Sequence, residues 1–151
     1  MSEIFETTFV PEVARELITS NSFTRDDVIH IGRAQTNRVL ETMPLANKVL
    51  FCDTDLITTQ IYAKQYLGEA PELLFKLEEM IQYDHYFLFD IDVPWVADGM
   101  RDLIHKREEM YDVFKKELLK RKIPFTVVKG TYEEREKFLE ERIRQIVNAA
   151  D

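Results

Sequence analysis

The chain has 151 residues, of which 20 are Lys or Arg and 28 are Asp or Glu, so its formal net charge at pH 7 is −8. Hydrophobic residues make up 45% and charged residues 32%, which fits one folded domain and excludes disordered and collagen-like chains. Because the acidic excess would repel a polyphosphate backbone, we predict no nucleic acid partner.

The predicted elements alternate between short apolar runs and amphipathic segments. In chain order they are a strand at 7–10, a helix at 11–18, a helix at 24–43, a strand at 48–52, a helix at 57–66, a helix at 73–81, a strand at 86–89, a helix from 102 onward, a strand at 124–128 and a last helix that opens at 131. Residues 1–151 are expected to form a single domain.

Several helix ends carry local signals. Thr24 to Asp27 and Thr131 to Glu134 resemble capping boxes, in which the first side chain and the fourth satisfy each other's backbone N–H groups. Pro11 suits the first turn of a helix, where its missing N–H has no partner anyway.

The strands read as near-continuous apolar runs separated by helices. Such runs are typical of parallel strands covered on both faces, so the predicted class is α/β with a parallel sheet flanked by helices. The single cysteine, Cys52, excludes an intrachain disulfide and a thiolate metal cluster. No basic signal start and no span of roughly 20 apolar residues is present, so we predict a cytoplasmic protein with no membrane partner.

Acidic side chains follow three of the predicted strands, at the edge where an open parallel sheet binds its ligands. We expect them to converge there and to attract Mg²⁺ bridged to a phosphate, which indicates phosphoryl chemistry. The six acids are Glu12, Glu16, Asp53, Asp55, Asp90 and Asp92. For Asp53 or Asp55 taken singly, an equal alternative is the N-cap of the next helix.

A loop after the strand at 86–89 carries further candidates. Trp95, the only tryptophan, is followed by Asp98, Gly99 and Arg101. This segment is expected either to cover a ligand, with Arg101 neutralising a transferring phosphoryl group, or to form a hinge turn with Trp95 packed in the core.

Three segments together resemble the ribosylnicotinamide kinase domain of bacterial NadR-type proteins, a P-loop kinase family related in architecture to nucleoside kinases. These segments are Pro11-Glu12-Val13-Ala14-Arg15-Glu16, the run from Asp53 to Gln60 followed by Tyr66-Leu67-Gly68, and Trp95-Val96-Ala97-Asp98-Gly99-Met100-Arg101. The Asp-Thr-Asp-x-x-Thr-Thr-Gln run is the most specific of them.

The resemblance implies ATP-dependent phosphorylation of the ribose 5′-hydroxyl of nicotinamide riboside, with ATP and Mg²⁺ as cofactors. It implies that Glu12 accepts the hydroxyl proton, that Arg15 helps hold phosphate and that Arg101 is the lid arginine. Asp53 and Asp55 take the metal or substrate-ribose position, while Trp95 and Asp98 shape the lid over the substrate.

The family's phosphate-binding loop has no counterpart in this sequence. No glycine precedes Gly32 and no Gly-Lys pair occurs, so the first strand and the loop that cradles the nucleotide phosphates are missing. We therefore expect a gap in the sheet and no turnover by this chain alone. A late start of the sequence, a loop supplied by another chain, and a relative that binds without turnover all stay open.

Two other functions stay open as well. The first is a non-catalytic nucleotide-binding or interaction module that forms a dimer through the sheet edge left open by the missing strand. The second is a phosphatase of the haloacid dehalogenase type, because an apolar strand ending in Asp53-Thr54-Asp55 resembles the nucleophile motif of those enzymes.

Overall fold

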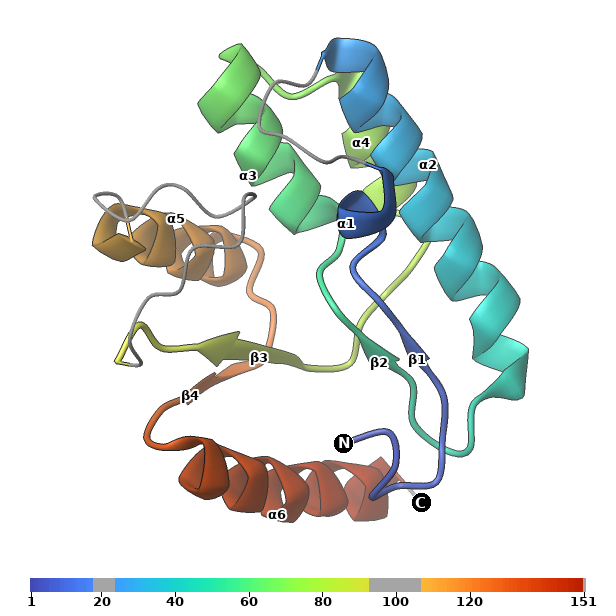
Figure 1. Ribbon diagram of the computed structural model, residues 1–151, viewed down its shortest axis with the longest axis vertical. Coiled ribbons are helices and arrows are strands. Elements are labelled where there is room, and N and C mark those ends of the chain that lie inside the picture. The colour runs from blue at the N-terminus through green and yellow to red at the C-terminus, as the bar shows by residue number, and fades with distance from the viewer. Residues whose placement is uncertain (18–23, 93–106, 151) are drawn as a thin grey trace.

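The computed structural model describes residues 1–17, 24–92 and 107–150 as helices, strands and their connections (Figure 1). The elements, in chain order, are β1 (Phe9–Val10), α1 (Val13–Leu17), α2 (Arg25–Thr42), the 3₁₀ turn η1 (Met43–Leu45), β2 (Phe51–Cys52), α3 (Leu56–Leu67), α4 (Glu72–Glu78), β3 (Tyr86–Phe89), α5 (Arg107–Lys120), β4 (Phe125–Val128) and α6 (Tyr132–Ala150). None of the helices in the described residues is long and apolar enough to cross a membrane.

The local helix signals are confirmed. The Thr24 hydroxyl accepts a hydrogen bond from the Asp27 N–H at 3.2 Å, and the Asp27 carboxylate accepts one from the Thr24 N–H at 2.8 Å. Thr131 and Glu134 make the same reciprocal pair at the start of α6, at 3.3 and 3.2 Å. These bonds satisfy N–H groups that have no partner within the helix, so the caps fix where α2 and α6 begin.

The strands form two separate parallel pairs rather than one continuous sheet. In β1 and β2, Phe9 pairs with Phe51 and Val10 with Cys52, while β3 and β4 pair in register from Tyr86↔Phe125 onward. Among the described residues the pairs share no strand ladder. The predicted α/β class with parallel strands flanked by helices is confirmed.

Helix α3 packs between two parts of the molecule, with α2 and α4 on one side and α5 with the β3–β4 pair on the other. One face contributes Leu56 and Ala63 to a core cluster with Val28 of α2 and Leu74 of α4. Its other face contributes Ile57 and Ile61 to a second cluster, which lies against α5 and the β3–β4 pair and includes Met110, Leu118, Tyr86 and Phe125. Figure 1 shows α3 between the α2–α4 side and the β3–β4 side.

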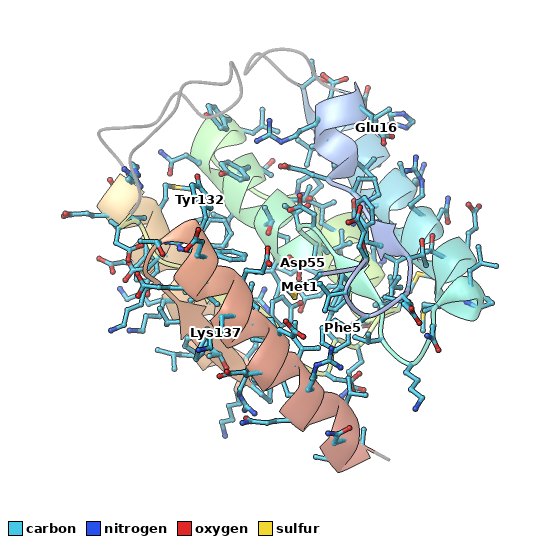
Figure 2. The ribbon with its side chains drawn as sticks, turned by 60° about the horizontal axis from the view of Figure 1, so that its bottom comes forward. Met1, Phe5, Glu16, Asp55, Tyr132 and Lys137 are labelled. Atoms are coloured by element: carbon cyan, nitrogen blue, oxygen red, sulfur yellow. The ribbon has the colours of Figure 1, made fainter. Side chains whose placement is uncertain are left out.

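The N-terminal turn packs beside the first strand pair and α6. The Phe5 ring lies 5.8 Å from the Phe51 ring, and the Arg144 guanidinium of α6 lies 4.8 Å from the centre of the Phe5 ring. Figure 2 shows Phe5 beside α6. Such cation–π and ring contacts give this short segment a defined place against the fold.

Candidate functional site

The carboxyl ends of β1 and β2 bring two predicted site residues to neighbouring positions. Val10 and Cys52 are paired in register, and the Asp53 N–H continues the ladder by donating to the Val10 carbonyl oxygen at 2.8 Å. Glu12 therefore follows one strand by two residues, and Asp53 follows its neighbour by one. This is the edge at which parallel strands of an open sheet bind ligands.

Glu12 and Arg15 form an ion pair at this edge. The Arg15 Nε atom donates to a carboxylate oxygen of Glu12 at 2.6 Å, across one turn at the start of α1. The predicted proton acceptor and the predicted phosphate-binding cation are thus next to each other. Because the ion pair is charge-assisted, it orients the Glu12 carboxylate.

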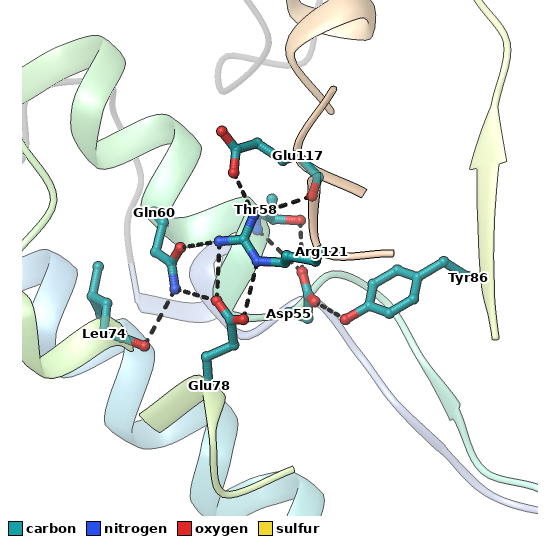
Figure 3. A network of polar contacts seen from close by, with 8 residues as sticks. All are labelled: Asp55, Thr58, Gln60, Leu74, Glu78, Tyr86, Glu117 and Arg121. Carbon is teal, nitrogen blue, oxygen red and sulfur yellow. Dashed lines mark hydrogen bonds and ion pairs between the residues drawn. The ribbon is translucent and has the colours of Figure 1, made fainter. Parts of the chain in front are cut away.

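Asp55 is the N-cap of α3, the alternative that the sequence left open for it. Its carboxylate accepts hydrogen bonds from the N–H and the hydroxyl of Thr58, both at 3.1 Å, and from the hydroxyl of Tyr86 on β3 (Figure 3). The residue is only 5% exposed, and this burial raises its pKa although the bonds from Tyr86 and Thr58 oppose the shift. The predicted substrate contact of Asp55 stays a prediction.

The remaining acids do not join a common cluster. Glu16 pairs with Arg38 at 3.0 Å and lies at the periphery, far from the central Asp55 in Figure 2. Asp92 pairs with Arg135 and accepts a bond from the Gly130 N–H at 2.7 Å. The expectation that six carboxylates converge is wrong, because most of them bind cations or N–H groups within their own part of the fold.

The described residues do not fit a magnesium site by themselves. Nowhere in the described ranges do three His, Cys, Asp or Glu side chains lie close enough together to hold a metal ion. Asp53 is exposed at the strand end, and one carboxylate needs phosphate or further protein oxygens beside it to hold Mg²⁺. The assignment of Asp53 as a metal ligand stays a prediction.

Three predicted residues of the lid lie outside the described residues. They are Trp95, Asp98 and Arg101. Their roles stay predictions that follow from the resemblance.

The sequence analysis did not predict the polar contacts that Gln35 and Arg121 make. Gln35, on α2, is 2% exposed and bonds to the segments that follow β1 and β2. Arg121, just after α5, bonds to Glu78 and Gln60 (Figure 3). The sequence does contain a signal for the buried contacts of Gln35. This residue occupies the same helical stripe as Ile31 and Val39, where a polar residue needs a buried partner.

A family model described as AAA domain matches residues 1–135 of the chain. Two curated relatives are the trifunctional NAD biosynthesis/regulator proteins NadR of Salmonella typhimurium (strain LT2) and of Escherichia coli (strain K12). Each is 33% identical to this chain over 111 residues, which is 68% of this chain and 27% of the relative. The chain therefore spans about a quarter of the length of these relatives.

Solved structures show the same fold. The chain is similar to a crystal structure of NadR protein in complex with NR, with a TM-score of 0.68 and 18% identity, over 87% of this chain and 41% of that one. A NadR structure in complex with NAD and AMP-PNP gives a TM-score of 0.70 and 19% identity, over 90% and 41%. The expected resemblance to the P-loop kinase-like domain of NadR-type proteins is confirmed, and the chain belongs to the AAA domain family.

Proposed function

We propose that this chain is the nucleoside-binding part of a kinase-type domain that phosphorylates nicotinamide riboside at its ribose 5′-hydroxyl in NAD synthesis or salvage. The observation that carries the proposal is the placement of Glu12, Arg15 and Asp53 at the adjoining carboxyl ends of β1 and β2. The similarity to a NadR structure in complex with NR supports this choice of ligand.

Each of the three side chains has a distinct task in this proposal. Glu12 accepts a hydrogen bond from the ribose hydroxyl and takes its proton as the hydroxyl attacks phosphorus. Arg15, held against Glu12 at 2.6 Å, offers a cation to the incoming phosphate. Asp53, the exposed acid of the group, takes the second ribose contact.

ATP and Mg²⁺ need ligands beyond the described residues. A nucleotide triphosphate requires a phosphate cradle, and the described residues alone do not fit a magnesium ion. The tasks of Glu12, Arg15 and Asp53 therefore concern nucleoside binding and the hydroxyl proton only, and turnover is expected to require a phosphate-binding loop supplied to this chain.

Calorimetric titration with nicotinamide riboside tests the proposal. We expect the wild-type chain to bind the nucleoside. Glu12→Gln should weaken binding about tenfold, because a neutral acceptor replaces the charged one and Arg15 loses its ion-pair partner. Glu16→Gln is the matched control, since Glu16 lies on α1, only four residues after Glu12, but pairs with Arg38. Absence of binding by the wild type, or equal affinity of Glu12→Gln and wild type, would remove the basis of the proposal.

A second candidate function is an interaction module that pairs an open strand edge with another copy of the chain. It is favoured by the division of the strands into two pairs, because in the described residues β2 and β3 each have a ladder partner on one side only. Unpaired edges are templates for strand addition. Light scattering during gel filtration would detect the dimer, and a monomer at high concentration would argue against this function.

The phosphatase alternative gains no support from the described residues. Asp55, the second acid of the Asp53-Thr54-Asp55 motif, is buried, caps α3 and bonds to Thr58 and Tyr86.

A further inference from the structure

Gln35 connects the two loops that carry Glu12 and Asp53. Its side-chain oxygen accepts a hydrogen bond from the Val13 N–H at 3.3 Å, and its side-chain nitrogen donates to the Thr54 carbonyl oxygen at 3.5 Å. Val13 directly follows Glu12, and Thr54 directly follows Asp53. One side chain on α2 therefore contacts the backbone next to both carboxylates.

The position needs an amide in particular. Gln35 is 2% exposed, so bulk water cannot replace its side chain as the hydrogen-bond partner of these two loops. One partner is an N–H donor and the other is a carbonyl acceptor, so only a side chain with an acceptor and a donor at its end satisfies both. The same requirement fixes which end of the amide faces Val13.

The ladder between the two strands reaches only to the start of these loops. The pairing of β1 with β2 covers two residues in each strand, and the last ladder bond runs from the Asp53 N–H to the Val10 carbonyl. Thr54 then adopts a φ of 67°, in the left-handed region that β-branched residues rarely occupy. The contact from Gln35 to the Thr54 carbonyl therefore falls on a residue whose conformation needs support from its surroundings.

We propose that Gln35 is a positioning residue that sets the spacing between Glu12 and Asp53 and thereby the geometry in which the nucleoside is held. This inference rests on the function proposed above. Gln35 acts through the backbone at Val13 and Thr54, while Glu12 and Asp53 contact the ligand.

Two substitutions separate the two contacts. Gln35→Met keeps the length of the side chain and removes both bonds, whereas Gln35→Glu, in its ionised form at alkaline pH, keeps an acceptor for the Val13 N–H and loses the donor for the Thr54 carbonyl. Thr36→Val is the matched control. Thr36 is the adjacent residue, is 1% exposed, and donates from its hydroxyl to the Gly32 carbonyl within α2 at 2.8 Å, so this change removes an equally buried bond whose partner lies within α2.

Nicotinamide riboside binding and backbone amide NMR signals are measured on the same variants. We expect Gln35→Met to weaken nicotinamide riboside binding about tenfold and Thr36→Val to leave it within about twofold. In amide NMR spectra, Gln35→Met is expected to shift the signals of residues 12–15 and 53–55. Gln35→Glu is expected to shift those of 53–55 alone, and Thr36→Val neither set.

The outcomes distinguish this inference from the proposed function. If Gln35→Met binds the nucleoside as the wild type does, or if Thr36→Val weakens binding equally, the positioning role is overturned. If the wild type does not bind the nucleoside, the proposed function fails, and the amide signals decide on Gln35. Shifts at both loops in Gln35→Met and not in Thr36→Val then support the positioning role, and unchanged loop signals overturn it.

Discussion

Replacing Arg121 by Met is expected to destabilise the fold by breaking the polar network between α3, α4 and α5. The Arg121 guanidinium donates to Glu78 at 3.0 and 3.2 Å and to the Gln60 side-chain oxygen at 2.9 Å, and it also pairs with Glu117 (Figure 3). Gln60 in turn donates to Glu78 at 2.8 Å and to the Leu74 carbonyl oxygen at 3.3 Å. One cation thus neutralises two carboxylates and satisfies a buried amide.

The expected loss in the free energy of unfolding depends on how deeply these side chains are buried. Arg121 is 18% exposed at its side chain, while Glu78 and Glu117 are each 29% exposed. Although burial lowers the pKa of Arg121, its bonds to Glu78 and Glu117 outweigh this effect and raise the pKa, so the group stays charged. Hydrogen bonds to charged groups contribute roughly 1.5–3 kcal/mol, and partial solvent access reduces this, so we expect a loss of about 2 kcal/mol.

Urea unfolding measures this loss, and Lys76→Met is the matched control. Lys76 lies 3.9 Å from Glu72 with side chains 70% and 85% exposed, and its replacement should change the free energy of unfolding by less than about 0.5 kcal/mol. Adding Glu78→Gln to Arg121→Met removes one of the two carboxylates left without this cation and should restore about 1 kcal/mol. If Arg121→Met and Lys76→Met prove equally stable, or if Glu78→Gln restores nothing, the reasoning is wrong.

Two further predictions concern packing and the thiol. Gly32→Ala should cost about 1–3 kcal/mol in the free energy of unfolding, because the added Cβ would lie 2.6 Å from Leu74 Cδ2 and 3.3 Å from Leu56 Cδ1, and an unchanged urea midpoint would contradict this. Burial raises the pKa of the Cys52 thiol to about 11 from its ordinary value of 9.0. Alkylation at pH 8 should therefore be roughly a hundredfold slower in the native than in the unfolded chain and should accelerate with rising pH, and equal native and unfolded rates would contradict it.

Local sequence signals were sufficient for much of the secondary structure. Capping boxes, a proline or glycine at a helix end and runs of apolar residues act within a few residues of each other, so their effect does not depend on the rest of the fold. The strand at 86–89 was predicted with its observed bounds, whereas the strand predicted at 48–52 is shorter. Lys48 has a φ of 65°, Val49 bridges back to Asn47, and β2 begins only at Phe51.

The candidate site was predictable only in part. That Glu12 and Asp53 lie at one edge follows from a general property of parallel strands, whose carboxyl ends meet there. That Asp55 turns inward does not follow from it, because the same acid serves equally well as a helix cap and as a ligand until its neighbours are known.

The sequence by itself determined the α/β class, the helix caps and the resemblance to NadR-type kinase domains, since these depend on residue types at short spacing. Only the tertiary structure decided which polar side chains are paired. Tyr86 reaches Asp55 across 31 positions and Arg121 reaches Gln60 across 61. These pairings depend on how α3 packs between α2 and α4 on one side and the β3–β4 pair on the other, because a buried polar group must bond to whatever the packing places beside it.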